Sequence, residues 1–372
     1  MALRKAEDSL QAALSAFNFG GPVTGVARHG RGHINDTFAV TACQPGVQSR
    51  RFILQRINTY VFKNPAALMQ NIVGVTGYLQ KVITANNGNP ARETLTVVSS
   101  RQGLPYFTAP DGSAWRVYLF IEDAVCYQVA ETPALFEASG QAFGNFTRLL
   151  QGYPAETLHE TIPHFHNTPR RFENFLKALR ADALNRAQSC AAEVEFVLGR
   201  RAQYATLTGL LQQGRLPLRV THNDTKLNNI MMDPAARKGV CIIDLDTVMP
   251  GLSLYDYGDS IRYGANTATE DEKDRAIVSF SLPLFESYTR GYLKGAGDIL
   301  WPLEKQMMPW GAKIITLECG MRFLTDYLEG DLYFKAERPG HNLQRAQTQF
   351  ALAADMERQW EAMRQTVQKL AF

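Results

Sequence analysis

Several features that would place this chain in a specialised class are scarce or missing. Its 372 residues include only five cysteines, which are scattered and form no CxxC pair, so we expect reduced thiols rather than a disulfide framework. No apolar run reaches the roughly 18 residues that a membrane span needs, and the N-terminal stretch carries charges where a secretory signal would be apolar. We therefore expect a cytoplasmic protein that does not bind a membrane.

A strong excess of one charge is missing too. The chain carries 39 basic and 36 acidic side chains, a net charge of +3, which is too near balance to indicate binding of nucleic acid. Hydrophobic residues make up 45% and charged residues 20%, which excludes a disordered or collagen-like chain. At about 150 residues per domain, a globular chain of 372 residues is comfortable as two domains.

Short runs of strand-forming residues come first. Five strands are expected, at residues 23–27, 37–41, 51–57, 94–99 and 115–121. Turn-rich segments separate the first three strands, which predicts an antiparallel meander. Asn64 and Pro65 supply an N-cap and a proline at the first helical position for a helix that runs to about residue 83. We place a domain boundary at residue 123, so that residues 1–123 form a small lobe.

After this boundary the pattern is mainly helical. Helices are expected at residues 133–150, 169–186 and 192–213, and from about residue 282 to the end. A β-rich island interrupts them with the stretches LRVTHND, NNIMMD and VCIIDLD. The long last helix carries an apolar stripe over residues 343–370, which favours packing against the chain's own body over a dimer seam. We expect an α+β protein with a larger lobe over residues 124–372, existing as a monomer or a weak homodimer.

The strongest chemical signal is THNDTKLNN followed by IIDLD. His222, Asp224 and Asn229 are spaced H-x-D-x4-N, and Asp244 ends the next strand fifteen residues after Asn229. The oxygens of Asn229 and Asp244 suit Mg²⁺, and Asp224 is then free to contact and deprotonate an acceptor hydroxyl. Asp246 adds a third acid that would repel the other two without a cation. The alternative is three strand-end acids that bond turn amides, and His222 is expected to fix the backbone.

These motifs resemble those of the aminoglycoside phosphotransferase and choline kinase superfamily, and the resemblance covers nearly the whole chain. Together with YDYGDSIRYGANTA, LECGMRFLTDYLEGD and ERPGHNL, the stretches THNDTKLNNI and IDLDTVMPGL resemble one branch, the bacterial N-acetylhexosamine 1-kinases. The resemblance implies a bilobal protein-kinase-like fold whose small lobe binds the nucleotide. It also implies phosphate transfer from ATP, with Mg²⁺, to the anomeric C1 hydroxyl of N-acetylglucosamine or N-acetylgalactosamine.

The turn HGRGHINDT lies where the glycine-rich loop of such a small lobe belongs. Gly30 and Gly32 let the backbone approach phosphates, and Asn35 and Thr37 are further candidate nucleotide contacts. A GxG turn also occurs in ordinary hairpins, so its place between the first two strands carries the prediction. His33 either faces the sugar from this loop or is a solvated loop histidine.

The third strand departs from the protein-kinase pattern. Gln55 stands where a lysine would pair with the α- and β-phosphates, and Arg56 points to the opposite face of the strand. The partner acid is missing as well, because residues 68–71 offer only amides. Either Mg²⁺ neutralises the phosphates beside Gln55, or the nucleotide site is impaired and Gln55 is a strand residue with no role in binding. Glu122 and Ala124 follow the fifth strand as the expected hinge, where backbone groups would read the adenine edge.

The acceptor side rests on two residues. In the hexosamine kinases that the chain resembles, an arginine and a tyrosine at the places of Arg322 and Tyr333 contact the sugar. Because Arg322 lies among apolar neighbours, it needs a polar partner if it is buried. That partner is either the sugar or Asp326, four residues further along a helix. Asp256 and Asp259, in YDYGDSIR, are expected to support the catalytic loop.

The predicted activity is an ATP- and Mg²⁺-dependent N-acetylhexosamine 1-kinase that gives the sugar 1-phosphate. One alternative is another small-alcohol kinase of the superfamily, acting on choline, a methylthio-sugar, homoserine or an aminoglycoside. A nucleotide-binding pseudokinase is a second alternative, motivated by Gln55. A metal-dependent hydrolase is a third, although it leaves the pattern of the small lobe unexplained.

Overall fold

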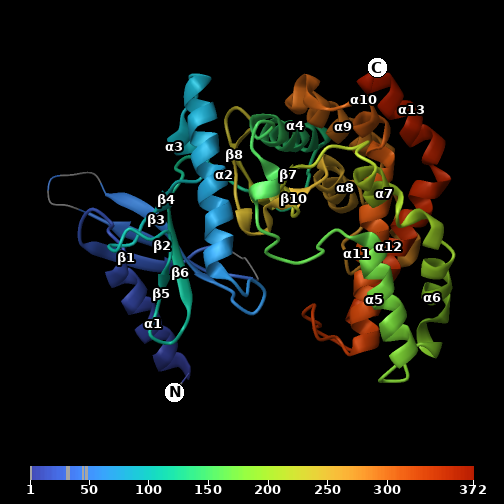
Figure 1. Cartoon of the computed structure of the whole chain (residues 1–372), viewed down its shortest axis with the longest axis horizontal. Coiled ribbons are helices and arrows are strands. Elements are labelled where there is room, and N and C mark those ends of the chain that lie inside the picture. The colour runs from blue at the N-terminus through green and yellow to red at the C-terminus, as the bar shows by residue number, and fades with distance from the viewer. Residues whose placement is uncertain (1, 31–33, 44–45, 47–48) are drawn as a thin grey trace.

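The computed structural model describes residues 2–30, 34–43, 46 and 49–372, with only the backbone of residues 2–6, and sets a sheet beside a mostly helical part (Figure 1). The sheet contains β1 (Val23–Arg28), β2 (Asp36–Ala42), β3 (Arg50–Ile57), β4 (Val97–Val98), β5 (Phe107–Thr108) and β6 (Ala114–Leu119). Its order is β1-β2-β3-β6-β4, with β5 on β6, and all pairs are antiparallel. The predicted α+β class and the meander of the first three strands are confirmed, and the boundary at residue 123 stays a prediction.

The two faces of this sheet have different neighbours. Leu54 of β3 and Val117 of β6 pack in a cluster with Phe17, which follows α1 (Ala2–Ala16). Ile57 and Tyr118 point the other way, into the large core cluster that continues through the helical part. Because side chains alternate along a strand, odd-numbered residues of β3 and even-numbered residues of β6 face the helical part of the molecule.

Helix α2 (Pro65–Ala85) lies between the sheet and the helical part (Figure 1). The Asn64 side chain caps it by accepting from the Ala67 amide at 3.1 Å, as the sequence predicts. Asn71, one of the amide residues where a kinase-like helix would carry an acid, donates to the carbonyl oxygens of His159 and Val248 at 2.8 and 3.0 Å. This buried amide therefore ties α2 to the segment that follows Asp244.

The helical part is built around helices that pack on one another. It contains α3 (Pro90–Glu93), α4 (Pro133–Leu149), α5 (Thr168–Ala181), α6 (Ala191–Leu198), α7 (Thr206–Gln212), α8 (Ser253–Gly264), α9 (Leu282–Ala296), α10 (Pro302–Gln306), α11 (Met308–Glu329), α12 (His341–Arg358) and α13 (Trp360–Ala371). Helices α4 and α9 approach closely because glycines face one another. A Cβ on Gly144 or Gly295 would fall inside contact distance of a carbonyl oxygen on the partner helix. Gly258 of α8 touches α11 in the same way.

Two predicted helices are interrupted. The expected helix at residues 192–213 consists of α6 and α7 with a loop and a short 3₁₀ turn between them, and Gly199 ends α6. The long final helix breaks at Gln359 into α12 and α13. The apolar residues of both pack into the chain's own core, as expected. Within the described ranges, no helix is long and apolar enough to cross a membrane.

Candidate active site

Two small antiparallel sheets carry the predicted catalytic residues. Strand β7 (Arg219–Thr221) pairs with β10 (Met249–Gly251), and β8 (Ile230–Asp233) pairs with β9 (Lys238–Ile242). The H-x-D-x4-N stretch forms the connection from β7 to β8, and Asp244 follows β9. The β8–β9 hairpin lies between the paired strands β7 and β10, so the connection from β7 to β8 and the end of β9 bring Asp224, Asn229 and Asp244 to one place.

The catalytic loop is held from behind by α8. Asp256 accepts hydrogen bonds from the amides of His222 and Asn223 at 2.8 and 2.7 Å, and Asp259 accepts from the Thr225 amide at 3.1 Å. The ring of His222 is buried; its Nε2 donates to the Ile243 carbonyl, and its Nδ1 accepts from the Asp224 amide. The supporting contacts expected of the two acids are present, and His222 has the structural role predicted for it.

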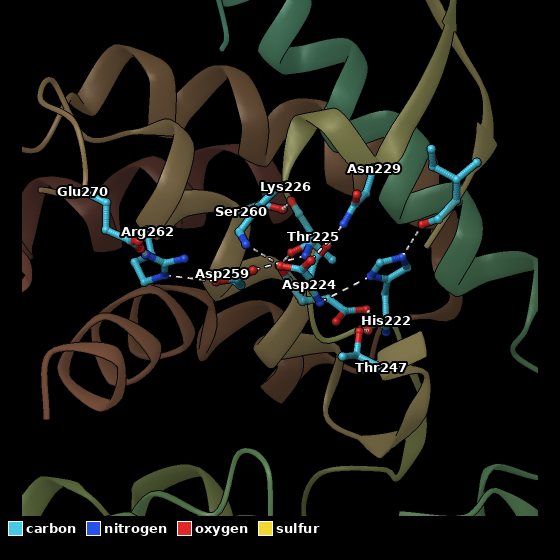
Figure 2. Close-up of polar contacts among 12 residues, drawn as sticks. His222, Asp224, Thr225, Lys226, Asn229, Thr247, Asp259, Ser260, Arg262 and Glu270 are labelled. Atoms are coloured by element: carbon cyan, nitrogen blue, oxygen red, sulfur yellow. Dashed lines mark hydrogen bonds and ion pairs between the residues drawn. The ribbon is translucent and has the colours of Figure 1, made fainter. Parts of the chain in front are cut away.

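Asp224 stands at the centre of these contacts (Figure 2). Its Oδ1 lies 2.9 Å from the Lys226 ammonium, and its Oδ2 accepts from the Asn229 amide at 3.0 Å. Burial is the largest influence and works to raise the pKa of this carboxyl, but Lys226, His222 and Asn229 together outweigh it, so the pKa is lowered and Asp224 is ionised at neutral pH. Asp224 still exposes 27% of its side chain, which leaves it open to an acceptor. The sequence analysis did not single out Lys226.

Asn229 and Asp244 carry the oxygens predicted to hold a divalent metal. The Asn229 side-chain nitrogen is used by Asp224, which leaves its carbonyl oxygen for a cation. Asp244 adopts a left-handed backbone, with φ at 59°, and its side chain is exposed. Its pKa rises to about 7 because desolvation and the charges of Asp246 and Asp224 disfavour the charged form, while the charges of Arg116 and Lys226 oppose the rise.

This donor set fits a hard cation in part. A divalent ion would relieve the repulsion between the neighbouring carboxylates, and its remaining positions would be taken by phosphate and water oxygens. In the part of the chain that the structure describes, no group of three or more His, Cys, Asp or Glu side chains gathers to form a metal site. The protein alone therefore supplies an incomplete shell, as expected of a metal held jointly with a nucleotide.

Asp246 is fixed by one residue just before β2 and one residue within the sheet. Its Oδ2 accepts from the Asn35 side chain at 2.7 Å, and its Oδ1 forms an ion pair with Arg116 of β6. Arg116 is 1% exposed, and the sequence analysis missed it. An arginine inside the buried strand AWRVYL was the available signal, because a buried guanidinium requires a partner.

The predicted phosphate-binding turn is only partly described. Gly30 has a positive φ of 74°, which glycine adopts without strain, while Gly32 and His33 lie outside the described residues. Thr37 and Gln55 bond each other, with the Gln55 Nε2 donating to the Thr37 Oγ1 at 3.0 Å. These positions stay predicted nucleotide contacts.

The predicted hinge has protein partners of its own. Arg92 donates to the carbonyl oxygens of Glu122 and Asp123 at 2.7 and 2.9 Å, and the Glu122 carboxylate pairs with Arg51. The hinge role of Glu122 and Ala124 stays a prediction, and the carbonyl of Glu122 would have to serve Arg92 and adenine together.

Arg322 and Tyr333 line one cavity of about 360 Å³ between α5 and α11. Its lining residues are Arg171, Asn174, Lys177, Arg322, Thr325, Asp326, Glu329, Tyr333 and Phe334. The Arg322 guanidinium lies 5.2 to 5.8 Å from the ring centres of Phe165, Tyr333 and Phe334. Two predicted acceptor residues are thus brought together.

The alternative partner of Arg322 is used elsewhere. Asp326 accepts from the amides of Leu332, Tyr333 and Phe334 at 2.7 to 2.9 Å, so it holds the loop that carries Tyr333. Among the described residues no carboxylate lies within ion-pair distance of Arg322. A helical salt bridge from Arg322 to Asp326 is therefore not formed.

Helix α8, which supports the catalytic loop, packs against α11, which carries Arg322. Arg262 of α8 pairs with Asp259 and with Glu270, as Figure 2 shows. Burial raises the pKa of the Cys319 thiol on α11 to about 11, and the charges of Arg262 and Arg322 both pull it down. Arg322 and Arg262, the partner of Asp259, therefore both act on the Cys319 thiol.

A model of the phosphotransferase enzyme family matches residues 25–293, from β1 through most of α9. The chain belongs to the phosphotransferase enzyme family. The prediction of a phosphotransferase enzyme is confirmed, and the hydrolase alternative is wrong.

Solved structures share the fold at low sequence identity. The microcompartment-associated aminopropanol kinase is 13% identical, with a TM-score of 0.56 over 97% of this chain and 98% of that chain. An aminoglycoside phosphotransferase from Alicyclobacillus acidocaldarius is 14% identical, with a TM-score of 0.56 over 97% and 96%. Amicoumacin kinase, in complex with AMP-PNP, Ca²⁺ and Ami, is 14% identical, with a TM-score of 0.56 over 92% of each chain. The kinase-like fold predicted from the sequence is confirmed.

Proposed function

We propose that this phosphotransferase uses ATP and a divalent cation, Mg²⁺, to phosphorylate the anomeric C1 hydroxyl of an N-acetylhexosamine. The observation that carries the acceptor assignment is the Arg322 guanidinium, which lies among aromatic rings, lines a cavity and has no carboxylate partner among the described residues. A sugar offers hydroxyl and acetamide oxygens to such a donor, and its apolar ring face can pack against Tyr333 or Phe334.

The charges around the cavity favour an uncharged acceptor over a cation. Arg171, Lys177 and Arg322 all line it, and the pKa of Arg171 falls to about 10 because of burial and the nearby charge of Arg322. The Asp326 carboxylate, which could otherwise bind a cation, accepts hydrogen bonds from three backbone amides. The positive charge of the cavity would repel choline or a polyamine-like aminoglycoside, whereas it would not repel an uncharged N-acetylated sugar.

The reaction follows from the position of Asp224. Asp224 aligns the C1 hydroxyl and accepts its proton as the hydroxyl oxygen bonds to the γ-phosphorus, and the bond from that phosphorus to the bridging oxygen of ADP breaks. A lowered pKa makes Asp224 a weak base, which suffices because the anomeric hydroxyl is the most acidic on the sugar. Asn229 and Asp244 would hold Mg²⁺, which when bound supplies charge stabilisation to the phosphates. Positioning and electrostatics therefore carry the catalysis.

The test is phosphate transfer from ATP to N-acetylglucosamine and N-acetylgalactosamine, with phosphorus NMR to locate the ester. We expect a sugar 1-phosphate. Arg322→Met should raise the KM for the sugar by about tenfold or more while leaving the KM for ATP unchanged, because it removes a charged hydrogen-bond donor. Arg290→Met, at an exposed ion pair on α9, is the matched control. An ester at C6, or no ester, would overturn the acceptor assignment.

A second candidate acceptor is a small amino alcohol. Glu329 also lines the cavity, and burial and Asp326 raise its pKa, a strain that an ammonium group would relieve. The structures of similar fold include an aminopropanol kinase and an aminoglycoside phosphotransferase. A panel containing aminopropanol, choline and kanamycin beside the two sugars separates the candidates directly, since the better kcat/KM identifies the acceptor class.

A further inference from the structure

The positive charge that is missing from the third strand is present on its neighbour. We propose that Arg116 of β6 is the fixed cation of the nucleotide site, and that it neutralises phosphate charge in place of a lysine on β3. This inference rests on the proposed use of a nucleoside triphosphate. In the proposed arrangement, Gln55 serves as the hydrogen-bond acceptor that orients Arg116.

Three neighbouring strands place their side chains in one row. Thr37 of β2 is registered with Gln55 of β3, and Gln55 with Arg116 of β6. The row is bonded throughout: the Arg116 Nε donates to the Gln55 Oε1 at 3.0 Å, and the Gln55 Nε2 donates to the Thr37 Oγ1 at 3.0 Å. Cross-strand partners share a face of the sheet, so Arg116 occupies the same face on which a β3 lysine would lie.

This row ends at the predicted metal segment. The terminal nitrogen of Arg116 pairs with Asp246, two residues after Asp244, and Asp246 is also bonded to Asn35 from the glycine-rich turn. Arg116 therefore sits at the meeting point of the glycine-rich turn, the third strand and the predicted metal ligand.

The local charge balance gives this arrangement a purpose. Asp244 and Asp246 together cancel a divalent cation, which would leave no net attraction for a triphosphate. With the charge of Arg116 added, the sum of these charges becomes positive. Because its side chain is almost fully buried, its charge acts through low-dielectric surroundings rather than through water.

A purely structural ion pair is the competing explanation. Arg219 and Glu304 form such a pair, buried and bidentate at 2.7 Å, with no predicted nucleotide residue among their contacts. This pair is the matched control, since its loss should lower stability without affecting the nucleotide. Arg116 differs from it by its contacts with Gln55 and Asp246.

The experiment measures ATP–Mg²⁺ binding by calorimetry, together with the KM values for ATP and for the acceptor. Arg116→Gln should weaken ATP binding by about tenfold or more, because a charged group is lost. It should change the acceptor KM by less than about threefold. Arg116→Lys, which keeps the charge, should retain most of the binding and serves if the glutamine variant does not fold. Arg219→Gln should bind ATP as the wild type does.

The decisive variant moves the charge back to β3. Gln55→Lys combined with Arg116→Gln should bind ATP several-fold more tightly than Arg116→Gln alone. The inference is wrong if folded Arg116→Gln protein binds ATP like the wild type, if folded Arg116→Lys protein loses about tenfold or more in ATP affinity, or if the transposed variant recovers no binding relative to Arg116→Gln. Failure of the wild type itself to bind any nucleotide would instead overturn the proposed function, so the two failures are distinguishable.

Discussion

Asp224 illustrates how single residues are prepared for chemistry in this protein. Its carboxylate is flanked by the Lys226 ammonium and the Asn229 amide, while its backbone amide is engaged by His222. These contacts fix the orientation of the carboxylate and keep it ionised, so it accepts a proton only from an acidic hydroxyl that is well placed.

Substitution of this residue gives the first prediction. We expect Asp224→Asn to lower kcat by about a hundredfold or more, the usual contribution of a general base, because the amide can align the acceptor but cannot take its proton. Steady-state kinetics with saturating ATP and acceptor measure the effect. Asp298→Asn, at an exposed carboxylate in a 3₁₀ turn after α9, is the control and should be neutral. A folded Asp224→Asn protein with near wild-type turnover would remove Asp224 from its assigned role.

The raised pKa of Asp244 gives a pH prediction. With a pKa of about 7, Asp244 is mostly protonated at pH 6 and mostly ionised at pH 8. Since a metal requires the carboxylate, Mg²⁺ binding should release a proton and tighten as the pH rises through 7, by about threefold to tenfold per unit below the pKa. Mg²⁺ titrations of the ATP complex at pH 6, 7 and 8, in two buffers of different ionisation enthalpy, measure both effects. Affinity that is constant with pH would contradict the assignment.

At the residue level, the sequence indicates which side chains lie together only where the signal is local. Asp224 and Asn229 precede the β8–β9 hairpin and Asp244 follows it, so a short stretch of sequence is enough to bring them together. Arg116 could not be found this way, because its partner Asp246 lies 130 residues further along the chain. The partner of Arg322 was left open for the same reason, since the capping role of Asp326 depends on how the loop after α11 folds back.

At the scale of elements, the close contact between α4 and α9 depends on glycines, which have no side chain. Four glycines, two on each helix, lie against carbonyl oxygens of the opposite backbone: Gly140, Gly144, Gly291 and Gly295. Glycine normally weakens a helix, so these positions are explained by close approach rather than by flexibility. The pair holds the core beneath α8 and the catalytic loop, with Tyr288 of α9 donating to Ser260 of α8.

This contact gives a stability prediction. Gly144→Ala should lower the free energy of unfolding by about 1–3 kcal/mol, the usual cost of overpacking, because its Cβ would meet the carbonyl of Tyr292. Gly77→Ala is the control: this helical glycine of α2 has open space around it, so alanine should raise stability by about 0.5–1 kcal/mol. Urea denaturation followed by circular dichroism measures both. Equal effects of the two substitutions would show that close packing at Gly144 does not matter.

Element prediction from sequence worked best where capping residues mark the ends. Asn64 and Thr132 each precede a proline and each accept from an amide of the first helical turn, as their sequence predicts. Apolar periodicity, in contrast, continued across the breaks after Leu198 and at Gln359. The helices on either side of each break pack into the core. Tertiary packing therefore determines where these helices end, and the local apolar pattern does not.

At the scale of the whole molecule, the apolar stripe of the C-terminal region is used internally. Met356 of α12 and Met363 and Val367 of α13 are buried in the chain's own core. We therefore expect a monomer of 41.5 kDa in solution. Sedimentation velocity over a hundredfold range of protein concentration is the measurement. A stable dimer at low micromolar concentration would show that another surface forms an interface.

The loop after α11 has a consequence for how acceptor preference can change. One carboxylate, Asp326, accepts from the backbone amides of three consecutive residues of this loop, so the path of the backbone does not depend on their side chains. Leu332 and Tyr333 are both largely exposed and can be exchanged without dismantling that anchor. Selection for a new substrate can therefore change the side chains at positions 332 and 333 alone, while Asp326 and the backbone that it holds stay the same.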